Sequence, residues 1–261
     1  MDDRTRNALM MQWTGVGASD IGRVRSANQD AFLINNQLGL WIVADGMGSH
    51  PHSDQASLKA VHSIETFLHQ YFSGERFSSG LDWPTLLKQS IHHAHESIQE
   101  EVASHPELTG IGTTVVLAFM PDPSKDSLFI AHSGDSRAYL LKGRTLTLLT
   151  RDHTLLEERI RLGLLPQNTP ASHESGHILT QAVGIDFPIT PDCSTIPLQP
   201  HDTVLLCTDG LNKMLEDETL SQLFLGSNSS SDPEDLCHRL IQGANHRGGH
   251  DNVTVVVIQK T

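Results

Sequence analysis

The sequence predicts an α+β fold in which antiparallel β-sheets pack together and helices flank them. Three observations support this prediction: two long one-sided helical patterns, a set of short β-rich runs, and tight turns between neighbouring runs. Strands that follow each other through short turns pair in antiparallel fashion. Because the helices come between groups of strands and not after every strand, packed antiparallel sheets are favoured over a doubly wound parallel sheet.

Two helical patterns are long enough to cover a sheet. In Ser53–Tyr71 and in Trp83–His105, apolar side chains recur at spacings of three and four residues, which places them on one face of a helix. In the second of these, His92, His93 and His95 are expected on the solvated face. Each helix must therefore cover an apolar surface.

The surface to be covered is a set of short runs rich in β-branched and aliphatic residues. These runs are Leu40–Ala44, Thr113–Phe119, Leu128–Ala131, Ala138–Leu141, Thr203–Cys207 and Val253–Ile258. The pair Lys142 and Gly143 marks the clearest hairpin turn. A short helix is expected over Leu155–Leu162, and another after the polar segment Gly226–Asp232.

The composition excludes several classes of protein. The chain has 261 residues, of which 38% are hydrophobic and 19% charged, so a sizeable core is possible. No apolar run approaches the ~20 residues that span a bilayer. The net charge of −13 argues against nucleic acids and anionic membranes as partners. The three cysteines lack disulfide or zinc spacing, and no signal peptide is evident, so a cytoplasmic location is expected.

Five aspartates lie at the ends of apolar runs. Asp45 and Asp209 follow strands and precede a glycine, Asp135 lies in a turn between two strands, and Asp30 and Asp251 begin strands. A single aspartate at a strand end is usually a turn former. Five with the same placement can converge on one rim of a sheet.

Converging carboxylates repel each other unless a cation lies between them, so the cluster predicts a metal site. An all-oxygen ligand set favours Mg²⁺ or Mn²⁺ over zinc or copper, and the carbonyl of Gly46 can serve as a further oxygen. Two cations about 3.5–4 Å apart can share one water, lower its pKa and present hydroxide to a phosphate ester. No nucleophilic side chain is then required.

Eight motifs, taken in order, carry a resemblance to a known family. They are RSANQD (25–30), ADGMGSH (44–50), GTT (112–114), GDSR (134–137), RDHT (151–154), LTQAVG (179–184), TDGL (208–211) and DNVT (251–254). The set resembles the metal-dependent Ser/Thr protein phosphatases of type 2C in their compact bacterial form. The resemblance extends over about residues 15–258, and the specific signal is the order of the motifs, because each alone is weak.

The resemblance implies a single phosphatase domain over residues 1–261 with an αββα sandwich, a core at about 15–258 and a flap at about 152–190 that touches substrate. The resemblance implies phosphorylated proteins as substrates. It also implies that the phosphatase reverses phosphorylation by a bacterial Ser/Thr kinase. We expect the protein to be a monomer.

The resemblance also implies roles for four of the five aspartates. It implies that Asp45 bridges two tightly bound Mn²⁺ or Mg²⁺ ions and that the Gly46 carbonyl binds one of them. Asp209 and Asp251 complete the ligand set of the other ion, while Asp30 acts through a metal-bound water.

Two further roles follow from the same resemblance. Asp135, together with Asp209, holds a third, weaker cation. Arg25 stands where the family keeps an arginine that forks onto the substrate phosphate, a geometry that guanidinium suits.

The chain departs from the family at two positions. Gln29 replaces a carboxylate that is common beside Asp30, which removes one charge near the metals. Met47 stands where some members have a histidine proposed as general acid. His50 and water on a third metal are the two candidates to replace it.

Other phosphatase chemistries do not fit. None of the three cysteines has an arginine six residues later, as cysteine-dependent phosphatases require. The nucleotide-binding and kinase motifs are also absent. The alternative is a non-catalytic relative that binds phosphoproteins as a regulatory module.

Overall fold

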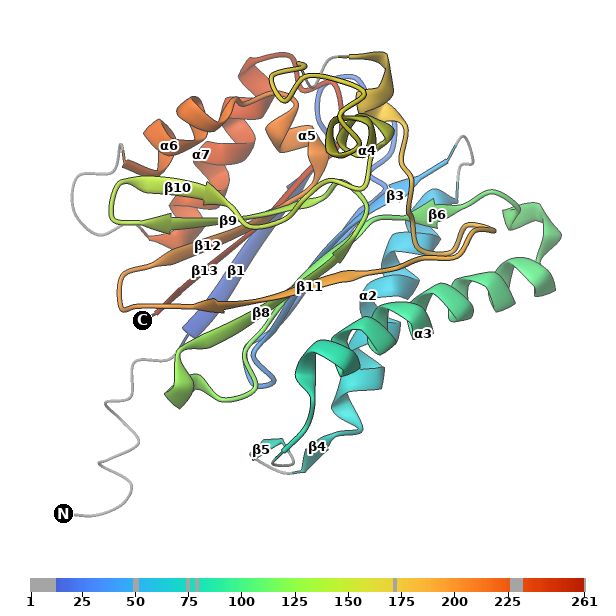
Figure 1. The fold of residues 1–261 in the computed structure, drawn as a ribbon, viewed down its shortest axis with the longest axis horizontal. Coiled ribbons are helices and arrows are strands. Elements are labelled where there is room, and N and C mark those ends of the chain that lie inside the picture. The colour runs from blue at the N-terminus through green and yellow to red at the C-terminus, as the bar shows by residue number, and fades with distance from the viewer. Residues whose placement is uncertain are drawn as a thin grey trace.

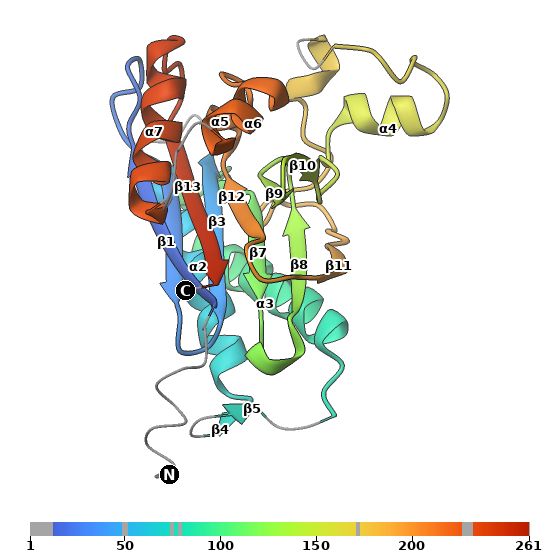
Figure 2. The ribbon, with the colours of Figure 1, turned by 90° about the vertical axis from the view of Figure 1, so that its left-hand side faces the viewer.

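Two large antiparallel β-sheets lie face to face between two layers of helices in the computed structural model of the protein (Figures 1 and 2). The structure describes residues 13–48, 52–73, 76–77, 80–170, 173–225 and 232–260. All strand pairs in the two large sheets are antiparallel among these residues. The predicted α+β class is therefore confirmed.

The first sheet places the last strand of the sequence in its interior. Its spatial order is β1 (Trp13–Asp20), β13 (Val253–Lys260), β12 (Thr203–Cys207), β9 (Arg137–Lys142) and β10 (Thr145–Leu148). The helices on its outer face are α5 (Asp209–Asn212), α6 (Asp217–Leu225) and α7 (Pro233–His246). Strand β13 thus pairs with both β1 and β12.

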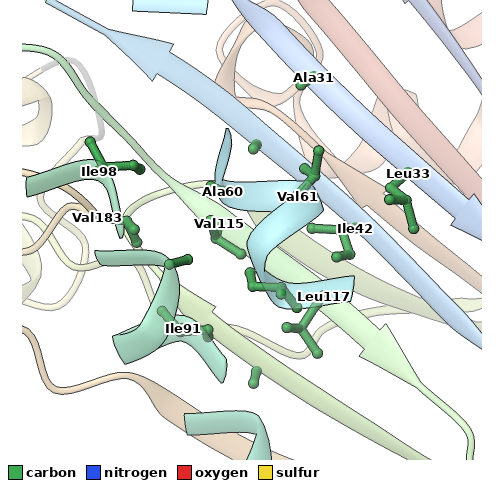
Figure 3. Close-up of a cluster of buried hydrophobic side chains, with 14 of the residues drawn as sticks. Ala31, Leu33, Ile42, Ala60, Val61, Ile91, Ile98, Val115, Leu117 and Val183 are labelled. Atoms are coloured by element: carbon green, nitrogen blue, oxygen red, sulfur yellow. The ribbon is translucent and has the colours of Figure 1, made fainter. Parts of the chain in front are cut away.

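The second sheet carries the two long helices. Its spatial order is β11 (Asp192–Pro197), β8 (Ser127–Ser133), β7 (Val115–Phe119), β3 (Leu40–Met47) and β2 (Asp30–Asn35), and the short β6 (Gly112–Thr113) pairs with the end of β3. Helices α2 (Ser53–His69) and α3 (Trp83–Ser104) cover its outer face, as Figure 3 shows for Val61, Ile91 and Ile98.

Short elements connect these layers. The hairpin of β4 (Phe72–Ser73) and β5 (Arg76–Phe77) follows α2, and α4 (Leu155–Arg161) lies between β10 and β11. Single turns of 3₁₀ helix occur at η2 (Pro106–Leu108), η3 (Pro123–Lys125) and η4 (Glu174–His177). None of the helices in the described part of the chain has the length and apolar character that a membrane crossing needs.

The strand sequences explain why the sheets pack on both faces. In β3, Leu40 and Ile42 point into the core under the helices, whereas Trp41 and Val43 point into the core between the sheets. This alternation follows from the two-residue period of a strand. A strand buried on both faces needs a continuous apolar run, and 40–44 supplies one.

Several predicted boundaries need correction. The run predicted at 113–119 is divided at Thr114 into β6 and β7. The strand predicted to stop near Asp45 continues through Gly46 to Met47, because β6 extends its hydrogen-bonding partner. In α2, Leu58 is 48% exposed, and small residues such as Ala56 and Ala60 face the sheet instead.

Helix α2 offers a matched test of the packing. Ile64 is fully buried and Leu58 is 48% exposed on the same helix. We predict that Ile64→Ala lowers the free energy of unfolding by about 2–5 kcal/mol, because it leaves a cavity. Leu58→Ala should cost less than about 1 kcal/mol. Denaturant unfolding at a fixed metal concentration measures both, and equal costs would contradict this packing.

Candidate functional site

Two aspartates face each other across the β2–β3 ladder. Asp30 and Asp45 are register partners, so their side chains leave the sheet on the same face and close together. Burial raises the pKa of Asp45 well above its ordinary value, and the charges of Asp30, Asp209, Asp135 and Asp251 raise it further. The structure therefore brings all five predicted aspartates close to one another.

Two threonines hold Asp30 in place. The hydroxyl groups of Thr208 and Thr254 donate to Asp30 Oδ2 over 2.9 and 2.7 Å. The other carboxylate oxygen, Oδ1, is buried without a hydrogen-bond partner among the described residues. Burial raises the pKa of Asp30 to about 7, although the two hydroxyl groups lower it. One oxygen is thus fixed and the other is available for a ligand.

The remaining aspartates come from three chain segments. Asp209 is the first residue of α5, two residues after the end of β12, and Asp135 lies in the turn between β8 and β9. Asp251 precedes β13, and its Oδ1 accepts from the backbone amide of Asn252 over 2.9 Å. Asp209 Oδ1 is buried and has no hydrogen-bond partner in the described part of the chain. Burial, followed by the charge of Asp209, raises the pKa of Asp135 to about 7.

A lysine that the sequence patterns did not single out reaches into the cluster. The Lys213 ammonium donates to Asp209 Oδ2 and lies 4.0 Å from Asp135 Oδ2. Burial disfavours this ammonium, but the charges of Asp209 and Asp135 outweigh that effect and raise the pKa of Lys213. Lys213 therefore remains protonated at neutral pH.

Arg25 lies at the exposed side of the cluster. Its Nη2 is 2.7 Å from Asp251 Oδ2, and its side chain is 48% exposed. The loop that carries it is fixed by Asn252, whose side-chain amide donates to the carbonyl oxygens of Ile21 and Ala27 over 2.9 Å each. The side-chain oxygen of Asn252 accepts from the backbone amide of Gln29 over 2.9 Å. Arg25 and Asp30 are thereby positioned by one asparagine.

Close backbone approach requires glycine beside two of the aspartates. A Cβ atom on Gly46 would collide with the carbonyl oxygens of Gln29 and Ser53, and one on Gly210 would collide with that of Asn252. The Asp-Gly sequence at each position therefore serves packing as well as the site. Met47 is half-buried in β3, and His50 lies outside the described residues.

The segment at 152–190 contains α4 and η4 and projects beyond the sheets (Figure 2). Its ends are tied to the body of the protein. His153 Nδ1 accepts from the Gly134 amide over 3.2 Å, and Thr113 and Val183 exchange backbone hydrogen bonds. His95, expected on a solvated face, is instead buried, and its Nδ1 accepts from the Gly184 amide over 3.0 Å.

A second group of metal-binding residue types occurs near the start of this segment. One nitrogen of His132, one of His153 and a carboxylate oxygen of Asp192 lie within 4.8 Å of one another. His153 already uses both ring nitrogens, one accepting from Gly134 and the other 3.3 Å from Asp192. Since a metal would displace the second contact, this group is better described as a hydrogen-bonded link between the 134–137 turn and the projecting segment.

The aspartate cluster fits hard divalent cations. Its donors are oxygen atoms, the set that Mg²⁺ and Mn²⁺ prefer. Two of its buried oxygens, Asp30 Oδ1 and Asp209 Oδ1, have no partner among the described residues. Buried polar atoms are normally satisfied, so an orphaned pair indicates a ligand.

The chain is similar to protein phosphatases in three comparisons. The family described as "Protein phosphatase 2C" matches residues 16–242. "Serine/threonine phosphatase stp" of Listeria welshimeri is 34% identical over 245 residues, which cover 93% of this chain and 94% of that protein. The serine/threonine phosphatase of S. agalactiae has a TM-score of 0.83 at 31% identity, with 95% and 100% of the two chains covered. The catalytic domain of PstP, solved with 2 manganese ions, has a TM-score of 0.78 at 28% identity, with 95% and 97% covered.

The raised pKa of Asp135 gives a prediction for the metal-free protein. A folded-state pKa above the ordinary value means that folding favours the protonated carboxyl, so stability falls as pH rises from about 4 to about 7. In chelator, the melting temperature of Asp135→Asn should therefore rise relative to that of the wild type as the pH increases from about 5 to about 8. Asp235→Asn, at an exposed position of α7, is the control. Parallel pH profiles for the wild type and Asp135→Asn would contradict the burial argument.

Proposed function

The chain belongs to the protein phosphatase 2C family, and we propose that its aspartate cluster is the metal centre at which phosphate is removed from serine and threonine side chains of other proteins. The protein is a metal-dependent protein Ser/Thr phosphatase. The observation that carries the proposed site is the convergence of five carboxylates with two orphaned buried oxygens. With its carboxylates ionised, such a cluster needs cations inside it to offset the repulsion.

We assign the tight ion pair to one part of the cluster. The charges of the other four aspartates all act on Asp45, which would bridge both cations. Asp209 and Asp251 would complete the ligand set of one ion. The Gly46 carbonyl and Asp30 would serve the other ion. When bound, the cations supply Lewis-acid chemistry: they activate water for attack on a phosphate ester and neutralise charge on its oxygens.

The protein's own residues would hold the substrate and orient the ligands. Thr208 and Thr254 fix one Asp30 oxygen, so the other keeps a constant direction. Arg25 uses one nitrogen on Asp251 and has further N–H groups for a phosphate. A guanidinium that bonds a carboxylate ligand and a phosphate together would place the ester against the metal centre.

The finer assignments rest on the same site. We propose Mn²⁺ or Mg²⁺ as the ions, and a third, weaker site at Asp135 and Asp209. We also propose one phosphatase domain over residues 1–261, in which 152–190 contacts the phosphoprotein. A Ser/Thr kinase would oppose the enzyme, and the protein would act as a cytoplasmic monomer.

Loss of Asp45 tests the metal centre. We predict that Asp45→Asn abolishes tight Mn²⁺ binding in calorimetry and lowers kcat for p-nitrophenyl phosphate on the order of 10³-fold, because both bridged ions lose a ligand. Excess chelator should likewise stop the wild type, and Mn²⁺ should restore it. Asp235→Asn should behave as wild type. Wild-type turnover in chelator would exclude this metal centre, and metal binding without any turnover would favour the non-catalytic alternative.

Arg25 tests phosphate binding. We predict that Arg25→Ala raises KM for a phosphopeptide by about 10-fold or more, because a charge-assisted hydrogen bond contributes about 1.5–3 kcal/mol. Arg25→Lys should restore little of this, since lysine cannot fork. Arg23→Ala, an exposed neighbour, is the matched control. A change confined to the Mn²⁺ requirement would show that Arg25 serves Asp251 and not the substrate.

A further inference from the structure

Lys213 is held at the aspartate cluster by its place after α5. The helix is one turn long, from Asp209 to Asn212, and the Lys213 amide donates to the Asp209 carbonyl over 2.8 Å. A spacing of four residues puts the two side chains on the same face of a helical turn. The ammonium consequently bonds the Asp209 carboxylate of its own turn.

The lysine also faces the aspartate of a separate segment. Its Nζ lies 4.0 Å from Asp135 Oδ2, and the charge of Asp209 raises the pKa of Asp135. Asp135 and Asp209 are 6% and 8% exposed, so little water screens their repulsion. The ammonium therefore offsets part of the negative charge of a buried carboxylate pair, which a lysine on an ordinary surface would not do.

An ammonium and a divalent cation compete for this pair of carboxylates. The ammonium bonds Asp209 Oδ2 and lies near Asp135 Oδ2, and two positive groups at such short range repel each other strongly where little water screens them. We propose that Lys213 is an internal cation that competes with the third metal ion for Asp135 and Asp209, and so sets the metal concentration at which that ion binds. This inference rests on the proposed function.

The structure gives the lysine an alternative position. Its side chain is 33% exposed, and a flexible four-carbon stem allows its head to reach solvent. When metal is scarce, the ammonium would remain on the two aspartates and reduce their repulsion. When metal is abundant, the ion would displace it. Lys213 is thus a positioning residue whose effect depends on metal concentration.

Replacement by methionine removes the charge and keeps the length of the side chain. We expect Lys213→Met to bind the weakest Mn²⁺ ion about 10–100-fold more tightly than the wild type, the range typical of changes around metal ligands. Binding of Mn²⁺ alone is measured by equilibrium titration with electron paramagnetic resonance, which counts free ions and needs no turnover. Lys59→Met is the matched control, because Lys59 is 35% exposed and pairs with Glu101 on the long helices.

A second variant identifies the ligands of the strengthened site. Adding Asp135→Asn to Lys213→Met should abolish the gain while the tight ions remain bound. Identical Mn²⁺ titrations for wild type and Lys213→Met would overturn the proposal, and so would a uniform shift of all ions. An increase in KM without any change in titration would also overturn it, by making Lys213 a substrate contact. A wild type that binds no Mn²⁺ would refute the metal centre itself, which is a different result.

Discussion

Negative charge withdrawn from water is the constraint on which this structure depends. Five carboxylates meet at one end of the two packed sheets, where β3, β8 and β12 end and β2 and β13 begin, and burial raises the pKa of Asp45, Asp30 and Asp135. Lone carboxylates in such a place would be protonated or would drive the segments apart. The described part of the chain contributes one ammonium, from Lys213, and one guanidinium, from Arg25, to the cluster. The remaining charge has to be balanced by ions from solvent, so the same repulsion that destabilises the empty fold provides the affinity for metal.

The scaffold can tolerate this strain because the groups around the carboxylates are rigid. Asp30 and Asp45 belong to paired strands, of which β3 is buried on both faces, and Thr208 and Thr254 reach Asp30 from the other sheet. Thr208 directly follows β12, and Thr254 lies within β13. The two sheets are therefore joined at the site by hydroxyl–carboxylate bonds and elsewhere by apolar packing.

Much of this arrangement could be predicted from sequence, for identifiable reasons. Apolar runs marked β12 at its observed bounds, and the five aspartates could be picked out because each borders such a run. Strand β1 was missed because Gly15 and Gly17 weaken its pattern; Gly15 is needed where the Trp41 indole leaves no room for a Cβ. Strand β11 is half-exposed and lacks a clear alternation.

The partners of Asp30 lie 178 and 224 residues away, a pairing that no local pattern encodes. Lys213 and His95 resembled surface residues because burial by a distant segment is decided only in the folded chain.

The position of β13 has a consequence for the order in which the protein can be made. This strand lies between β1 and β12, and Asp251 lies two residues before it begins. A ribosome delivers residues 13–207 before it delivers 251–260, so β1 and β12 must wait, each with an open edge, until their shared neighbour is translated. Unpaired edges of this kind attract other strands. The nascent chain also lacks one carboxylate of the cluster throughout that interval. The exposed edges make the same interval the one in which chaperones would matter most.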